Sequence, residues 1–470
     1  MTPAILAIAA TISVGLPLAA LLFPTASRTT LFALSYLYGS GAIFLTLFAL
    51  SAGGIPWSAP VVAACLLLIA GFSMFAVSRS WGGARASMVQ RPVEGTLWHA
   101  ALFDLLTLTM LTGYGLFATL GKLSEWDFWA IWGLKARAFL EAGGIDWRFL
   151  ESSLNSFSHP DYPLLLPLNF DFLALLSGGW DDRWLGFMFL AFAASLLLLV
   201  RELFLDDLPR GYAALGTFIT ASAACSHSVG LAETPLIAFS GAGILLIRRG
   251  LRDQEGNSFR NGAILLGLAG SCKNEGLAMI ASVAIAFIIV ERRQLRRLAE
   301  FWPALVIPLP WLVMRAVHYL PTDLVTGSVV QRALARLPTL HLLLLTLANR
   351  ITYGGFWISL LAAWVVIAIG QAILKRSNSV SSIVWRVDLF VIVAMAIQMA
   401  LYVASYAVTP ADVMWHIGTS WSRVSEQIAA PLIYVTVVML GRVIKSGGEV
   451  GSVVLSAERI THHASADRLK

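Results

Sequence analysis

Residues 4–23 read AILAIAATISVGLPLAALLF, and residues 184–200 read WLGFMFLAFAASLLLLV. Neither run contains Lys, Arg, Asp or Glu. A helix needs about 20 mainly apolar residues to cross the hydrocarbon core of a bilayer. Runs of this kind recur along the chain, and they predict an all-α fold, a polytopic transmembrane helical bundle.

The composition of the whole chain points to the same class. Of the 470 residues, 58% are hydrophobic and 13% are charged, and the mean hydropathy is +0.76. A soluble domain could not bury this much apolar surface. Hydropathy predicts about thirteen spans, at roughly residues 4–23, 30–52, 58–77, 98–120, 184–200, 211–228, 234–247, 262–272, 277–290, 302–320, 354–374, 387–408 and 428–444. No Lys or Arg precedes Arg28, so we expect the first span to be retained rather than cleaved as a signal peptide.

The basic residues indicate which side each connection occupies. Most of the 33 basic residues fall in alternate connections, which the positive-inside rule assigns to the cytoplasm. Residues 162–178 cannot be a full crossing without reversing the next five arginine-rich connections, so we expect a surface-lying or re-entrant helix there. The short pair 262–272 and 277–290 is expected to form a broken hairpin. The net charge of +6 is therefore attributed to basic residues on the cytoplasmic side of the membrane rather than to nucleic-acid binding.

These patterns divide the chain into three parts. Residues 1–97 are predicted to be an N-terminal transmembrane extension, and residues 98–444 a catalytic transmembrane module. Residues 445–470 are predicted to be a disordered cytoplasmic tail.

The first outer loop, residues 121–183, contains the sequence SEWDFWAIWGLKAR at 124–137. Trp126, Trp129 and Trp132 recur every third residue, as on a helix that lies in the membrane interface. Asp127 and Lys135 share another face at helical spacing, so a carboxylate and an ammonium group are predicted to face a substrate together. The alternative is an aromatic belt with solvated charges.

Four further polar residues interrupt apolar surroundings. His159 lies in the proline-rich turn 158–168 and is a candidate acid, base or hydrogen-bond donor, or a structural residue. Glu233 stands where a span emerges on the outer side, either as a functional carboxylate or within a helix cap. Lys273 and Glu275 break the apolar hairpin; they either neutralise each other or place Lys273 against an anionic head group.

The last outer loop presents a polar helical face. His416, Thr419, Ser420 and Arg423 lie at positions i, i+3, i+4 and i+7. A guanidinium flanked by hydroxyl groups is suited to a phosphate. The alternative is an amphipathic helix whose polar face meets water.

Several common functional signatures do not occur in the sequence. It contains no P-loop spacing, no GxGxxG, no HExxH and no GxSxG, which argues against ATP-driven transport and metalloprotease activity. The three cysteines, Cys65, Cys225 and Cys272, lie in apolar segments without CxxC spacing, so neither a disulfide framework nor a zinc site is expected. No metal ligands are assigned.

The order of these pieces resembles the GT-C-fold glycosyltransferases, in the branch similar to bacterial protein mannosyltransferases. The resemblance covers roughly residues 98–444 and depends on Trp126-Asp127, Lys135-Ala136, Tyr162-Pro163-Leu164, Lys273-Asn274-Glu275-Gly276 and the stretch from His416 to Arg423. Asp127 matches the essential acidic residue of that family's first outer loop, and Glu233 matches the acidic residue of its second. The chain differs in three extra N-terminal spans, in Glu rather than Asp at 233, and in lacking a large soluble C-terminal domain.

The resemblance implies transfer of a sugar from a polyprenyl-phosphate carrier to an envelope glycan, lipid or protein acceptor. Asp127 would act as general base, Glu233 and His159 would orient the acceptor, and the cations of Lys135, Lys273 and Arg423 would hold the departing phosphate. Trp126, Tyr162, Glu275 and His416 would contact substrate. Whether Asp127 and Glu233 share a divalent cation, Mg or Mn, is left open. The expected location is the bacterial inner membrane, with the site facing the periplasm; the alternative function is a secondary transporter or flippase of a lipid-linked or anionic substrate.

Overall fold

The computed structural model describes residues 2–80, 97–121, 123–320, 322, 328–353, 355–374 and 382–445. Every regular element within these ranges is a helix, which confirms the predicted all-α class. The cytoplasmic tail predicted for 445–470 lies, apart from its first residue, outside the described part of the chain.

Seven helices are long and apolar enough to cross a membrane. They are α1 (Thr2–Leu22), α2 (Arg28–Ala52), α3 (Ala59–Ser80), α4 (Leu97–Leu120), α9 (Phe187–Asp207), α11 (Glu233–Arg252) and α19 (Ser382–Val408). α9 passes this test together with the short helix that precedes it, residues 182–185. Three bent helix pairs raise the number to as many as ten. The bundle therefore has the composition of a multi-pass membrane protein, while the number of thirteen spans stays a prediction.

Three of the predicted spans form shorter helices. α10 (Arg210–Ala224) and α12 (Gly256–Gly270) each have 15 residues, and α13 (Asn274–Val290) has 17. At a rise of 1.5 Å per residue, such helices reach about 22 to 26 Å, less than the roughly 30 Å of hydrocarbon. This agrees with the expectation that the α12–α13 pair is a short hairpin.

The three bent pairs each contain an identifiable break. α14 (Trp302–Val306) and α15 (Leu309–Val317) meet around Pro308, and the segments on either side differ in direction by 52°. A proline inside a helix removes a hydrogen bond and bends the axis. In the second pair, α16 (Val329–Arg336) and α17 (Leu340–Tyr353) are followed by α18 (Gly355–Leu374). In the third pair, α20 (Val413–Glu426) is followed by the last helix, Ala429–Lys445.

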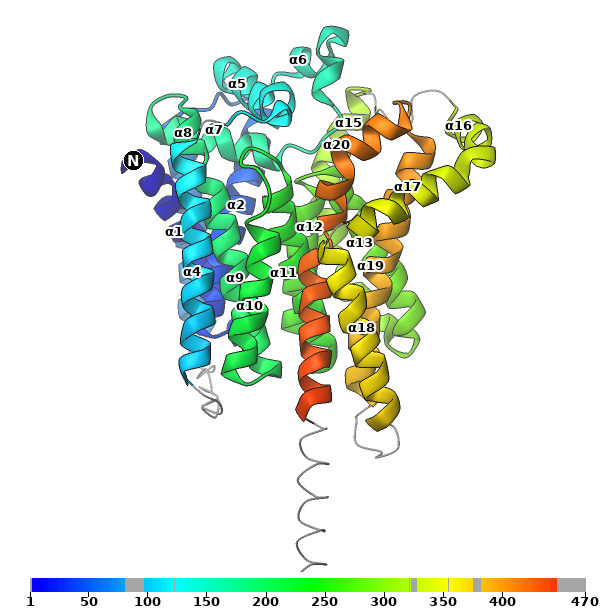
Figure 1. Cartoon of the computed structure of the whole chain (residues 1–470). Coiled ribbons are helices and arrows are strands. Elements are labelled where there is room, and N and C mark those ends of the chain that lie inside the picture. Colours follow the sequence, from blue (N-terminus) through cyan, green and yellow to red (C-terminus); the bar gives the residue numbers. More distant parts are fainter. Residues whose placement is uncertain are drawn as a thin grey trace, which may run out of the picture.

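The elements of the predicted outer loops gather at one end of the bundle. Figure 1 shows α5 (Gly133–Ala142), α6 (Trp147–Glu151), α7 (Leu165–Ser177), α8 (Asp182–Leu185), α16 and α20 at the same end. α15, from the predicted span 302–320, lies at this end as well. At the opposite end, the turn between α1 and α2 bonds to two other helices: Thr25 Oγ1 to Glu255 at 3.0 Å, and Ser27 Oγ to Glu202 at 2.9 Å. The loop assignments made from charge thus group together in space.

α7 lies inside the protein, and whether it is re-entrant or lies along the membrane surface stays a prediction. Residues 165–174 of this helix are all buried, so α7 does not lie on the molecular surface. Asn169 accounts for part of this burial, because its amide donates to Ser40 O at 3.2 Å and accepts from Ser40 Oγ at 2.9 Å. With 13 residues, α7 is shorter than a membrane span.

One apolar core extends across the boundary that we predicted at residue 97. The main cluster of buried residues runs from Ala7 to Met439 and includes Leu37, Phe192 and Phe239. α1 and α2 therefore pack into the same interior as α9 and α11.

Close glycine contacts hold α11 against α12. A Cβ atom at Gly243 would lie 2.9 Å from Gly262 O, and one at Gly262 would lie 2.5 Å from Gly243 O. Small residues allow helix backbones to approach this closely. The contact fixes the two helices whose ends carry Glu233 and Lys273.

A buried ion network joins four helices at the far end of α11 from Glu233. The Arg248 side chain is 1% exposed, with Nη1 2.8 Å from Asp207 Oδ2 and Nη2 2.7 Å from Asp388 Oδ1. Arg252 Nη1 lies 2.6 Å from Asp207 Oδ1, and Arg442 of the last helix pairs with Asp388. Because buried charges are stable only when paired, this network ties α9, α11, α19 and the last helix together.

Candidate functional site

Five charged side chains from separate parts of the sequence form a continuous series, which we call the charged chain: Asp127, Arg423, Glu233, Lys273 and Glu275. Arg423 Nη1 lies 2.7 Å from Asp127 Oδ2 and 3.9 Å from Glu233 Oε1. Lys273 Nζ lies 3.0 Å from Glu233 Oε1 and 2.9 Å from Glu275 Oε1. Acidic and basic groups thus alternate, and every member was a site residue predicted from the sequence.

Helix ends position these charges. Asp127 precedes η1 (Phe128–Trp132), Glu233 is the first residue of α11, and Glu275 lies in the first turn of α13. Arg423 lies in the last turn of α20. Carboxylates at helix N-termini and a cation at a C-terminus are favoured by the helix dipole. Lys273 is a cation at the N-cap of α13, where the helix dipole disfavours it. The carboxylates of Glu233 and Glu275 offset this effect.

The charged chain is buried in its middle, at Glu233 and Lys273, and partly exposed at both ends. The Glu233 side chain is 1% exposed and that of Lys273 is 7% exposed, whereas Asp127 and Arg423 are 23% and 27% exposed. A buried ion pair fixes its surroundings, because removing either partner leaves an uncompensated charge. A ligand from solution would therefore meet Asp127 and Arg423, or Glu275, which is 20% exposed, before it met the buried pair.

The segment before α5 differs from the interfacial helix that we expected. Residues Phe128–Trp132 form a π-helix, which changes the spacing of the tryptophans. Trp126 and Trp129 are 75% and 63% exposed, while Trp132 is 1% exposed. The prediction that the three tryptophans share one interfacial face was wrong, because the π-turn rotates Trp132 into the core. π-turns occur often at functional sites.

Lys135, His159 and Tyr162 form a second group with Trp132, the aromatic cluster. The Lys135 ammonium donates to His159 O and lies 5.7 Å from the ring centroids of both Trp132 and Tyr162. Tyr162 stacks on His159 with centroids 4.8 Å apart and on Trp132 with centroids 5.4 Å apart. Burial raises the pKa of the Tyr162 hydroxyl above its ordinary value, and the negative charge of Glu275 adds to this. The aromatic cluster therefore borders the charged chain and carries a hydroxyl that stays protonated.

The predicted phosphate-binding face of α20 is only partly directed to this site. His416 Nδ1 lies 3.0 Å from Thr409 Oγ1, and Thr419 Oγ1 donates to the backbone at Trp415 O. Ser420 Oγ donates to His416 O at 2.7 Å. Of these four residues, Arg423 is the one that belongs to the charged chain.

Sequence reasoning missed several residues beside the charged chain. Asn274 donates through Nδ2 to Asp161 Oδ2 at 2.8 Å, which ties the turn before α7 to the start of α13. His227 Nε2 lies 3.7 Å from Glu426 Oε2. Glu426 was detectable, because it follows Arg423 by one helical turn; His227, in an irregular segment, gave no periodic signal.

His227 leads to a prediction about pH. Burial lowers its pKa below the ordinary value of 6.5, and Arg423 and Lys273 act in the same direction against the opposing effect of Glu233. The unfolded chain therefore binds a proton below about pH 6.5 that the folded protein resists, so this residue makes the folded state less stable as the pH falls. In thermal unfolding at pH 7.5, 6.5 and 5.5, His227→Gln should lose less stability on acidification than the wild type. The exposed His341→Gln is the control and should keep the wild-type slope; an unchanged slope in His227→Gln would refute the assignment.

The described residues contain no group of three or more His, Cys, Asp or Glu side chains that could hold a metal ion. Asp127 and Glu233, the two acids considered for a shared cation, both contact Arg423 instead. The site is thus an arrangement of side-chain charges at one end of an all-helical bundle with seven to ten candidate spans. No family model, curated protein or solved structure matches the chain.

Proposed function

We propose that the protein is a multi-pass membrane glycosyltransferase. It transfers a sugar from a polyprenyl-phosphate carrier to an envelope acceptor at the periplasmic face of a bacterial inner membrane. The observation that carries the proposal is the charged chain, which places an accessible carboxylate, Asp127, next to a cation that a phosphate can engage, Arg423. The GT-C-like order of motifs supports the same assignment.

The reaction assigns roles to three members of the charged chain: Asp127, Arg423 and Lys273. Asp127 accepts the proton of the acceptor O–H or N–H group as that group attacks the anomeric carbon. The bond between the anomeric carbon and the phosphate oxygen breaks, and its electron pair stays with the polyprenyl phosphate. Arg423 and Lys273 stabilise the negative charge of this leaving group. Attack opposite the leaving group inverts the configuration of the sugar.

The resting pair between Arg423 and Asp127 requires one movement. Arg423 Nη1 is 2.7 Å from Asp127 Oδ2, so the carboxylate is engaged before substrate binds. An incoming phosphate competes for the guanidinium through charge-assisted hydrogen bonds. When Arg423 turns to the phosphate, Asp127 becomes free to accept a proton.

The runner-up is a secondary transporter or flippase, because a buried Lys–Glu pair is also typical of transport sites. In transporters these charges usually lie near the bilayer midplane, in interrupted helices. Here the buried pair is connected through Arg423 to Asp127 of the first outer loop. This grouping at one end of the bundle favours an enzyme working at the membrane surface.

The test is sugar transfer by purified protein in lipid nanodiscs. A panel of radiolabelled polyprenyl-phosphate sugars serves as donor, and envelope extract supplies the acceptor. We expect donor-dependent labelling of acceptor that continues in EDTA, because the cations of the proposed site are side chains. Labelled carrier that crosses the membrane of sealed vesicles without sugar transfer would instead establish the transporter.

A further inference from the structure

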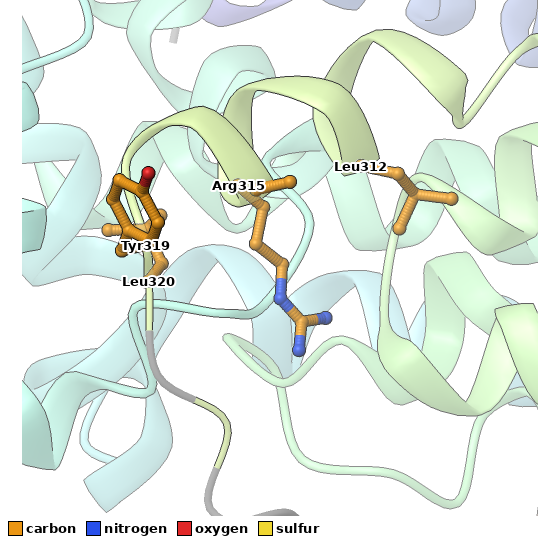
Figure 2. A pocket seen from close by; sticks show the side chains of 5 residues that line it. Leu312, Arg315, Tyr319 and Leu320 are labelled. Atoms are coloured by element: carbon orange, nitrogen blue, oxygen red, sulfur yellow. The ribbon is translucent and has the colours of Figure 1, made fainter.

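A pocket of about 390 Å³ lies at the C-terminal end of α15, outside the charged chain. It is lined by Leu312, Arg315, Ala316, Tyr319 and Leu320. Figure 2 shows the Arg315 side chain extending away from the helix, between Leu312 on one side and Tyr319 and Leu320 on the other. The pocket thus combines one guanidinium with apolar walls.

The pocket adjoins a surface suited to lipid. Leu312 and Arg315 lie one turn apart on α15, and Tyr319 follows the end of the helix with a positive φ of 50°. The neighbouring face carries three exposed apolar side chains, which are 48%, 49% and 60% exposed: Leu309, Val313 and Val317. An amphiphile could therefore place its hydrocarbon along α15 and its head group in the pocket.

The charge of Arg315 is less compensated than the charges of the site cations. Its Nη2 atom lies 3.9 Å from Asp161 Oδ2, and this same oxygen accepts a hydrogen bond from Asn274 at 2.8 Å. Lys273 and Arg423, by contrast, each have a carboxylate oxygen within 3.0 Å. Because Arg315 is 21% exposed, its guanidinium can bind an additional anion.

We propose that this pocket binds the phosphate head group of an anionic lipid, and that this lipid is the acceptor. The second part rests on the proposed function. There the carrier phosphate engages Arg423 and Lys273, so a second phosphate site belongs to the second substrate. The link from Arg315 through Asp161 to Asn274, the neighbour of both Lys273 and Glu275, places the bound lipid beside the charged chain.

The binding test uses full-length protein in detergent with phosphatidylglycerol as the probe and native mass spectrometry as the readout. Arg315→Gln should reduce lipid retention about tenfold, as expected for loss of a charge-assisted hydrogen bond. The matched control is Arg183→Gln at the same end of the bundle, whose guanidinium is already paired with Asp181 at 3.0 Å; it should retain lipid as the wild type does. Equal retention by Arg315→Gln would overturn the proposal.

Two competitors and one transfer assay separate the alternatives. Polyprenyl phosphate that displaces phosphatidylglycerol would assign the pocket to the carrier, and inorganic phosphate that displaces it would show that the apolar walls contribute nothing; either result would overturn the proposal. Arg315-dependent lipid binding, with sugar transferred only to a glycan or protein, would overturn the acceptor role. If no sugar is transferred to any acceptor but lipid binding still depends on Arg315, the glycosyltransferase proposal is wrong and the lipid site is retained.

Discussion

Replacing Asp127 by asparagine is expected to lower kcat for sugar transfer by about 10² to 10⁴, the usual contribution of a positioned general base. Asparagine has nearly the same shape as aspartate but cannot accept the acceptor's proton. KM for the donor should fall rather than rise, because the phosphate no longer competes with a carboxylate for Arg423. Transfer of labelled sugar in nanodiscs measures both constants.

The matched control for this substitution is Glu141→Gln. Glu141 is an acidic residue of the same outer loop, but its side chain is 70% exposed and pairs with Arg137 on the surface of α5. Its removal should leave kcat unchanged, because exposed pairs contribute little. Wild-type turnover by Asp127→Asn would move the general base to another residue, with Glu233 and His159 the next to be tested.

Arg248→Met should reduce the free energy of unfolding by about 3 to 5 kcal/mol, which is typical when one partner of a buried ion pair is removed. Arg248 contacts Asp207 and Asp388, and the side chains of Arg248 and Asp388 are each 1% exposed. Methionine fills part of the space but leaves carboxylates without this counter-ion. Unfolding by SDS in mixed micelles measures the loss.

Two variants test whether the unpaired buried charge causes the loss of stability in Arg248→Met. Arg260→Met changes an arginine that is 54% exposed and 3.8 Å from Glu300, and should cost no more than about 1 kcal/mol. The double variant Arg248→Met with Asp388→Asn should regain part of the lost stability. If the double variant is as unstable as Arg248→Met alone, lost packing rather than unpaired charge explains the effect.

Hydropathy was sufficient to locate the seven long apolar helices, because lipid-facing and core-facing segments must both satisfy their backbone groups within a helix. It could not fix where helices break. The bend between α14 and α15 required knowledge of how Pro308 sits in the packed bundle, and the π-turn after Asp127 depends on contacts that no period of 3.6 residues reveals.

The charged chain could be anticipated residue by residue, because each charge stands out in an apolar setting. Its connections could not be anticipated. Arg423 and Asp127 are 296 positions apart, and only the packing of α20 against the first outer loop brings them together. Asp161 was missed because it lies in a proline-rich turn whose path the sequence leaves undetermined, and Arg315 was missed because it lies within the span predicted at 302–320.

α11 has a mechanical consequence for conformational change in the bundle. Glu233 pairs with Lys273 at one end, Arg248 and Arg252 pair with Asp207 at the other, and Gly243 touches Gly262 between them. A slide of α11 by one helical turn, about 5.4 Å, would break both sets of buried pairs at once. α11 is therefore fixed at both ends and in its middle, so any conformational change that moves α11 must carry its partner helices with it.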